Sequence, residues 1–191
     1  MTKLLVRVVL PVAAGVVLLA GCTTTREGTA SPAQTSSAGG TSAPETTSVA
    51  GGAGTKSITD PCSLLQMSDL SSYGQFDPPD SKKIGTARSC SYQKTIASAS
   101  DHTMSIGVNV RDDASVDQVR DTGGGVVDKD INGRRAKEAP DGAAVGCTLG
   151  LPVGGTSRVD VEVLLDTSAD QACQIAEAVA TKAVEPKLPK G

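Results

Sequence analysis

Apolar and polar residues alternate along several short stretches in the second half of the chain. In MSIGVNVR, the apolar residues Met104, Ile106, Val108 and Val110 are separated by polar or small residues. This is the period of a strand with one buried face. The segment from Arg88 to Lys94 also has the pattern of a strand.

Two further pairs of strand-like segments are joined by turn residues. Asn132-Gly133 interrupts GVVDKDINGRRAK, and this dipeptide favours a type I′ hairpin turn. The segments CTLGLPV (147–153) and SRVDVEVLL (157–165) are separated by Gly-Gly-Thr and predict a second hairpin.

Capping residues mark four predicted helices. Asp60 precedes Pro61, a favourable first helical residue, and Ser68 caps a second short helix that ends at Gly74. Ser115 caps a third, which runs to about Asp121. The last helix follows Thr167 or Ser168 as its cap, and its apolar face contains Ala172, Ile175, Ala176, Val179 and Ala183.

Together these elements predict one α+β domain over residues 57–191. Its antiparallel sheet has about six strands and is covered on one face by the N-terminal and C-terminal helices. The predicted domain has about 135 residues, close to the most common domain size.

The first 21 residues have the layout of a secretory signal peptide. Lys3 and Arg7 precede an apolar run from Val8 to Leu19, and small residues follow it. A membrane-spanning helix needs about 20 apolar residues, whereas this run is shorter and contains Pro11. We therefore expect residues 1–21 to be a cleaved signal peptide.

The end of this segment, Leu19-Ala20-Gly21-Cys22, resembles the bacterial lipobox. The resemblance implies that cleavage follows Gly21 and that the thiol of Cys22 carries a diacylglyceryl group. Two acyl chains anchor a protein stably, whereas one does not. The expected location is the outer face of the bacterial cytoplasmic membrane, with the lipid anchor as the contact to the membrane.

Residues 22–56 combine the lipidated cysteine with a stretch of Thr, Ser, Ala, Gly and Pro. Such a segment buries too little apolar surface to offset the conformational entropy lost on folding. We predict a disordered tether with a mean end-to-end distance of roughly 30–35 Å.

The composition excludes nucleic acid as an expected partner. Cleavage after residue 21 removes Lys3 and Arg7 from 18 basic residues, which leaves 16 against 21 acidic residues and a formal charge of −5. The chain has no Trp, one Phe and two Tyr, so it lacks both the basic face and the stacking residues that nucleic-acid binding needs.

Without Cys22, an even set of four cysteines remains in an exported domain, where disulfides persist. Four cysteines allow three connectivities. We favour Cys62–Cys90 and Cys147–Cys173, because each pair would join a terminal helix to a nearby strand. A zinc site is the less favoured interpretation, because the chain has no C-x-x-C motif and one histidine.

The pattern DPCSLL, C-x-Y at Cys90 to Tyr92, a cysteine at Cys147 and CQIA in the last helix, followed by Leu-Pro, resembles an actinobacterial lipoprotein family. That family has no known function and includes mycobacterial lipoproteins of the LprB and LprC type. A tryptophan is common in the family where this chain has Tyr92, which affects packing. The resemblance implies no catalytic residues.

Four short motifs are weak candidates for chemistry. Ser91 and Lys94 match S-x-x-K, but on a strand positions three apart face opposite ways. Asp128, Asp130 and Asn132 match half of a calcium loop, although Ala139 occupies the position of its bidentate acid. A hairpin turn is the competing explanation.

His102 lies in a polar loop without a free thiol to act with, and we expect it to be a solvated loop residue. Gly123-Gly124-Gly125 comes after a helix and before a strand, which is the wrong order for a phosphate loop. We expect a connector there.

No complete catalytic or cofactor site follows from these motifs. We therefore expect an envelope-anchored binding or protein-interaction module. Its partner would be an unknown envelope protein or a small apolar or lipid ligand. A small apolar or lipid ligand would need an apolar cavity. The alternative is a hydrolase or other enzyme that acts on envelope material through Ser91 or His102.

Overall fold

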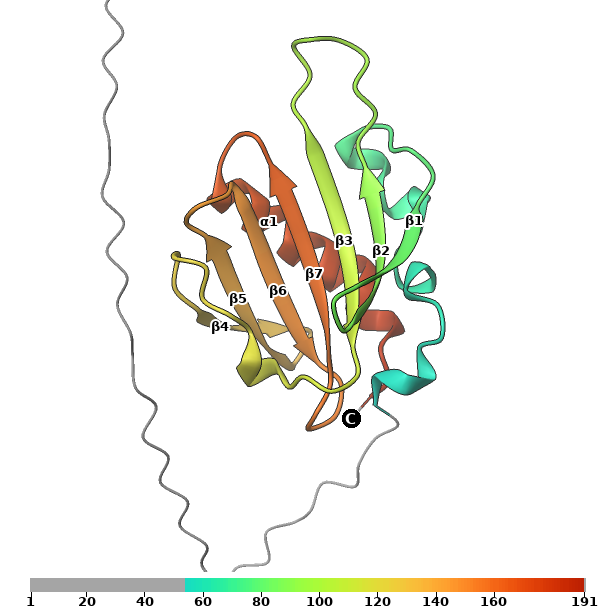
Figure 1. Cartoon of the computed structure of the whole chain (residues 1–191), viewed down its shortest axis with the longest axis vertical. Helices are drawn as coiled ribbons and strands as arrows, with labels where there is room; N and C mark the ends of the chain where they lie inside the picture. The colour runs from blue at the N-terminus through green and yellow to red at the C-terminus, as the bar shows by residue number, and fades with distance from the viewer. Residues whose placement is uncertain (1–53, 191) are drawn as a thin grey trace, which may run out of the picture. The chain divides into compact units, whose positions relative to one another are not determined.

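Alternating apolar residues form an antiparallel sheet in the computed structural model of the chain, which describes residues 54–190. These residues belong to one structural unit. The strands are β1 (Asp80–Ile84), β2 (Ala87–Gln93), β3 (Met104–Arg111), β4 (Val127–Ile131), β5 (Arg134–Asp141), β6 (Gly146–Pro152) and β7 (Arg158–Leu165). Their order across the sheet is β1-β2-β3-β7-β6-β5-β4 (Figure 1).

The sheet has seven strands where the sequence predicts about six. The additional strand is β1, whose sequence DSKKI is exposed at all five positions. An edge strand without a buried face shows no apolar alternation, and its lysines protect the sheet edge from pairing with another chain. The α+β class holds, with most of the structure in the sheet.

The predicted helices are present, but most are short 3-10 helices. Three of the predicted helices are η2 (Pro61–Leu64), η3 (Met67–Tyr73) and η4 (Val116–Gln118), and η4 ends three residues before the predicted end at about Asp121. Two further 3-10 helices, η1 (Thr55–Ser57) and η6 (Glu185–Lys187), are not predicted. Asp60 caps η2 as predicted, and η3 ends at Gly74. The cap of η3 is Gln66 instead of Ser68, because Gln66 and Asp69 form a reciprocal capping box.

The long helix, α1 (Ala169–Val179), continues as a π-helical turn, η5 (Ala180–Val184). Ser168 is its N-cap and accepts a hydrogen bond from the backbone N–H of Gln171. All five residues predicted for its apolar face are buried. Figure 1 shows α1 lying across one face of the sheet.

We call the sheet face toward α1 the inner face. It consists of alternate residues from the central strands, and these form the core: Cys90, Tyr92, Ile106, Val108, Val110, Cys147, Leu149, Leu151, Val159, Val161 and Val163. Tyr92, the position where a tryptophan is common in the resembling family, is 1% exposed and donates its hydroxyl to the carbonyl of Leu65. Burial raises the pKa of Tyr92 to about 12.

Two disulfides join the helices to the sheet, with the pairing that the sequence favours. Cys62–Cys90 links η2 to β2, and Cys147–Cys173 links β6 to α1. Closing loops of this length contributes roughly 3–4 kcal/mol each in the chain-entropy model.

Candidate functional site

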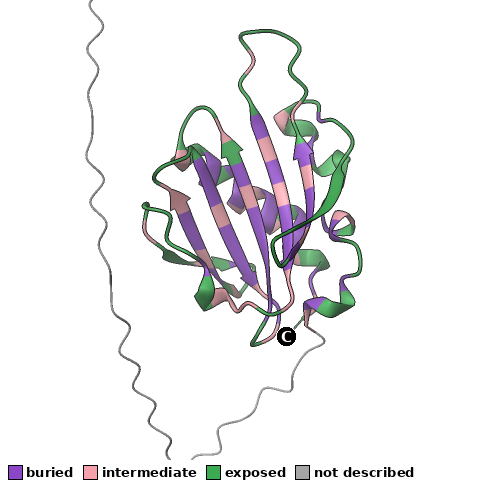
Figure 2. Ribbon diagram, viewed as in Figure 1, coloured by how far each residue is buried: buried purple, intermediate pink, exposed green. Residues whose placement is uncertain are grey.

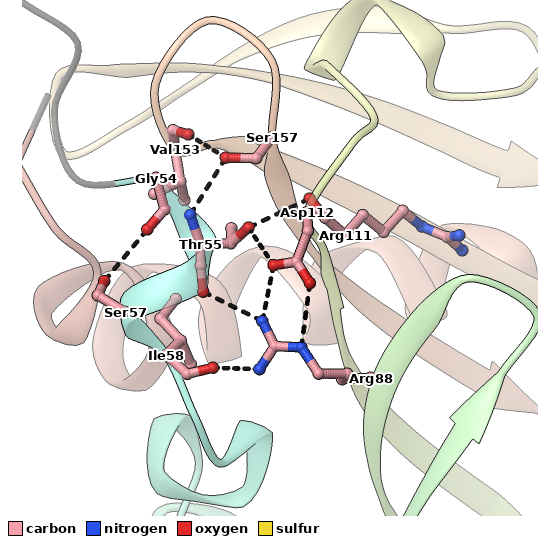
Figure 3. Close-up of polar contacts among 9 residues, drawn as sticks. All are labelled: Gly54, Thr55, Ser57, Ile58, Arg88, Arg111, Asp112, Val153 and Ser157. Atoms are coloured by element: carbon pink, nitrogen blue, oxygen red, sulfur yellow. Dashed lines mark hydrogen bonds and ion pairs between the residues drawn. The ribbon is translucent and has the colours of Figure 1, made fainter.

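The start of the described chain is held by a cluster around Arg88 (Figure 3). The Arg88 guanidinium donates to the backbone carbonyls of Thr55 and Ile58 and forms an ion pair with Asp112 (Nη2 to Oδ1, 2.7 Å). Thr55 is fully buried, and its hydroxyl donates to the same Asp112 oxygen at 2.8 Å. The hydrogen bonds from Arg88 hold the pKa of Asp112 below its usual range.

A third contact closes this junction. The backbone N–H of Thr55 donates to Ser157 Oγ at 3.2 Å, and Ser157 in turn donates to the carbonyl of Val153 at 2.5 Å. The sequence assigns residues 54–56 to the tether, but Thr55 is part of this packed cluster. The structured part of the chain therefore begins before Ser57.

The sheet face opposite α1, the outer face, carries the polar half of each alternating strand. Its centre is Asp160 on β7, which is 1% exposed. One oxygen of Asp160 lies 2.5 Å from Arg111 Nε on β3, and the other lies 2.6 Å from Arg158 Nε. Arg158 also donates to the carbonyl of Ser115 at 2.6 Å, which fixes the start of η4. One carboxylate thus orients two arginines.

Next to this cluster, Asn109 donates to Glu162 at 3.1 Å across the β3–β7 pair. On β2, the hydroxyl of Ser89 is buried and has no hydrogen-bond partner among residues 54–190. The outer face is therefore built from polar groups in fixed positions, most of which already have a partner within the sheet.

The segment 112–126 covers part of the outer face. A Cβ added at Gly150 on β6 would lie 2.6 Å from Val119 Cγ2, which shows that this segment packs directly on β6. Farther along, Thr122 and Gly123 form bridges to Asp141 at the end of β5.

Another part of the outer face has no such cover. A Cβ added at Gly107 would have only ordinary contacts, all with neighbouring residues of the sheet. Figure 2 shows buried and half-buried positions alternating along part of β3. We define the open face by its half-buried and exposed residues: Ser91, Ser105, Gly107, Thr148, Glu162 and Leu164.

The larger surface cavities among the described residues have charged side chains in their walls. One of about 380 Å³ beside η4 is lined in part by Asp117, Arg135 and Lys137. Another of about 440 Å³ at the junction is lined in part by Lys56 and Asp113. These cavities suit polar groups better than an apolar ligand.

Ser91 and Lys94 do not form a catalytic pair. Ser91 lies within β2 on the open face, where its hydroxyl donates to the carbonyl of Asp80 at 3.4 Å. Lys94 follows the end of the strand, and its backbone N–H donates to the carbonyl of Met104. The strand therefore keeps the two residues apart, as its period predicts.

His102 is exposed, with 71% of its side chain accessible, and its Nδ1 lies 3.0 Å from Asp166 Oδ1. Asp166 also accepts the backbone N–H of Thr103 at 2.8 Å, and this hydrogen bond lowers the pKa of Asp166. The four cysteines between residues 54 and 190 are all disulfide-bonded. A Cys-His pair is therefore not formed.

The three residues of the calcium motif each contact a different partner. Asp128 forms an ion pair with Lys137 at 2.7 Å, and Asp130 accepts the backbone N–H of Gly133 at 2.8 Å. The amide of Asn132 donates to the carbonyl of Thr181 at 2.9 Å. Asn132 and Gly133 have φ of 54° and 84°, the left-handed conformation of a type I′ turn. The hairpin accounts for these residues.

The glycine run is a connector, as predicted. Asp121 Oδ1 accepts the backbone N–H groups of Gly123 and Gly125 at 2.8 and 3.0 Å, and both glycines have positive φ.

The predicted signal peptide, the lipidated Cys22 and the tether as far as residue 53 lie outside the described residues. Within residues 54–190, no helix has the length and apolar character to span a membrane.

The sequence interpretation missed the residues of the outer-face cluster, Arg111, Arg158, Asp160, Asn109 and Glu162. They occupy the polar positions of the strands whose apolar positions predict the core. The alternation assigns them to a common face. It does not show which strands become neighbours, and only the β3–β7 pairing brings Arg111 beside Asp160.

A family model for proteins of unknown function, DUF3558, matches residues 17–186. The chain belongs to the DUF3558 family. The match includes both disulfides, the outer face and most of the C-terminal helical segment, and it agrees with the resemblance to a family of unknown function. No curated protein and no solved structure matches this DUF3558 chain.

Proposed function

We propose that this DUF3558 protein is a cell-envelope lipoprotein whose domain binds a protein partner through the open face. In this proposal Cys22 carries the lipid, residues 22–53 form the tether, and the domain works at the outer face of the bacterial cytoplasmic membrane. We also propose that the chain is related to lipoproteins of the LprB and LprC type.

The observation that carries the proposal is the fixed polar arrangement around Asp160, beside an uncovered part of the sheet. Polar groups that are already ordered lose little conformational entropy when a partner binds. The small residues Ser91, Ser105 and Gly107 allow a partner to approach the strands closely. Exposed Leu164 supplies an apolar contact at the margin.

A protein partner fits this face better than a small apolar ligand. The residues between the sheet and α1 are closely packed, with Val108, Val161 and Ala176 fully buried. The surface cavities have charged residues in their walls. The open face offers polar groups together with the exposed apolar side chain of Leu164, and protein–protein interfaces combine both kinds of contact.

Site-specific photocrosslinking in the native membrane tests the binding face. A photoreactive residue at Ser105 should give a discrete protein adduct, which Gly107→Arg abolishes by blocking the face. The matched control is a photoreactive residue at Lys83, on the exposed edge strand β1. Equal adducts at both positions, or adducts at Ser105 that Gly107→Arg leaves unchanged, would contradict the proposal.

The anchor has its own test. Cys22→Ser should abolish metabolic labelling with a fatty-acid analogue and move the protein from the membrane to the soluble fraction. If Cys22→Ser is still labelled and still retained at the membrane, the proposal that Cys22 carries the lipid is wrong. The binding face is tested independently by the crosslinking experiment.

One observation favours the alternative of an envelope hydrolase. His102 lies in an exposed loop that also contains Ser98 and Ser100. Its Nδ1 pairs with the carboxylate of Asp166, and a histidine oriented in this way can act as a general base. Labelling by a fluorophosphonate probe that is lost in both His102→Gln and Asp166→Asn would support a hydrolase. Absence of labelling in the wild-type protein would exclude a serine nucleophile of this kind.

A further inference from the structure

A buried carboxylate lies beside one of the two disulfides, on the inner face of the sheet. Glu138 on β5 places a carboxylate oxygen within 4.8 Å of the sulfur atoms of Cys147 on β6 and Cys173 on α1, which are bonded to each other at 2.03 Å. All three residues are buried, and 8% of the Glu138 side chain is exposed. No comparable group surrounds Cys62 and Cys90 in the described part of the chain.

The carboxylate of Glu138 is only half satisfied. Its Oε1 lies 3.3 Å from the ammonium of Lys129, whereas its Oε2 is buried and has no hydrogen-bond partner among residues 54–190. A buried carboxylate oxygen without a partner is costly, and native proteins rarely retain one without a reason. The carboxylate that carries this free acceptor lies beside two sulfur atoms.

The oxidised sulfurs are weak ligands, but reduction changes their chemistry. A dithiol can transfer two electrons and two protons to the Cys147–Cys173 bond, which yields two thiols and converts the dithiol to a disulfide. A divalent metal ion then displaces the two thiol protons and binds two thiolates. With Glu138, the set becomes three anionic ligands of the types that zinc binds.

A cavity and two further carboxylates adjoin this group. A cavity of about 280 Å³ adjoins the group and is lined in part by Cys173, Asp170 and Glu177. Asp170 and Glu177 lie three residues before and four residues after Cys173 on α1, so all three share one helix face. Lys129 Nζ forms ion pairs with both Glu177 (3.1 Å) and Glu138. Without binding the metal itself, Lys129 would orient the Glu138 carboxylate toward it.

We propose that Glu138, Cys147 and Cys173 form a latent zinc site, which is closed while the disulfide is intact and opens when a dithiol reduces it. The two thiolates favour zinc over calcium or magnesium, which prefer oxygen ligands. The disulfide and the metal site are alternative states of the same three residues. The sequence does not reveal the site, because its ligands come from two strands and a helix.

Cobalt is the probe for this site, because its thiolate charge-transfer and visible bands report tetrahedral coordination. The full chain is reduced with a phosphine, which becomes a phosphine oxide, and is then titrated with Co²⁺ and back-titrated with Zn²⁺. We expect one Co²⁺ per chain, displaced by one Zn²⁺, and no binding by the oxidised protein.

Glu138→Gln keeps the shape of the side chain and removes its charge. It should weaken zinc binding by at least about tenfold in the reduced protein, with an unchanged far-UV circular dichroism spectrum. Cys62→Ala/Cys90→Ala is the matched control, which should retain one tight site. Equal affinity of Glu138→Gln and the wild type would overturn the proposal, because an unfolded chain that binds through its thiols alone gives that result.

Discussion

The two faces of the sheet are made from the same strands by opposite means. On β3 and β7, every second residue is an aliphatic side chain packed toward α1, and the residues between them include Arg111, Asp160 and Glu162. The inner face is held by apolar burial, which is not directional. The outer face is held by ion pairs of fixed geometry, which determine where particular charged groups lie.

This difference separates the part of the domain that specifies the fold from the part that is available for recognition. An apolar face tolerates exchange among side chains of similar volume. The outer face does not, because each of its charged groups depends on a particular partner. Substitutions that act on one face and spare the other test this division.

The largest effect is expected from Asp160→Ala on the outer face. It leaves Arg158 buried without its carboxylate partner, which should lower the free energy of unfolding by about 3–5 kcal/mol. Urea denaturation measures this. The comparison variant is Glu162→Ala, two residues along β7, which loses a hydrogen bond to Asn109 and should cost about 0.5–1.5 kcal/mol. Similar costs for the two variants would contradict a central role for Asp160.

On the inner face, Leu149→Ala should lower the free energy of unfolding by about 2–5 kcal/mol, because it leaves a cavity in a fully buried position. Thr148→Ala is the matched control on the same strand. Its side chain lies on the outer face, and the change should stay within about 0.5 kcal/mol. Comparable losses at both positions would show that the faces are not energetically distinct.

Two glycines sharpen the distinction between the covered and open parts of the outer face. Gly150→Ala should destabilise the fold by about 1–3 kcal/mol, since its methyl group collides with Val119. Gly107→Ala should stabilise it by about 0.5–1 kcal/mol, because glycine in a strand carries an entropic penalty and the space above it is open. Thermal unfolding measures both, and a loss of stability in Gly107→Ala would show that this part is covered.

The smallest effect concerns pH. Arg88 lowers the pKa of Asp112 in the folded protein, so the ionised carboxylate contributes stability above its unfolded pKa of about 3.9 and loses it as the pH falls through the folded value. The difference in unfolding free energy between wild type and Asp112→Asn should be constant from about pH 5 to 7 and shrink below about pH 4. Asp113→Asn, at the exposed neighbouring residue, is the control.

The apolar pattern predicts the inner face well, because burial and strand period are properties of the local sequence. It identifies the residues of β3, β6 and β7 and the buried face of α1, and it places the turn at Asn132-Gly133. It misses β1, since DSKKI forms a strand only by pairing with β2. The predicted elements also favour the disulfide pairs, because each pair joins a terminal helix to a nearby strand.

The functional features are less accessible to sequence reasoning. The group around Asp160 depends on the order of strands in the sheet, and so does the neighbourhood of Glu138. The sequence interpretation assigns no role to Glu138, which lies one residue before Ala139 in the calcium motif. Its position beside two cysteines 9 and 35 residues later arises only when β5, β6 and α1 pack together.

The junction at Thr55 also has a mechanical consequence. A load that enters the domain at Gly54 passes through Arg88 to β2, through Asp112 to the end of β3, and through Ser157 to the start of β7. These strands include the centre of the sheet, so the load is divided among several hydrogen bonds and an ion pair that must break together. We therefore expect a pull on the N-terminal chain to load several strands at once instead of the edge strand β1 alone.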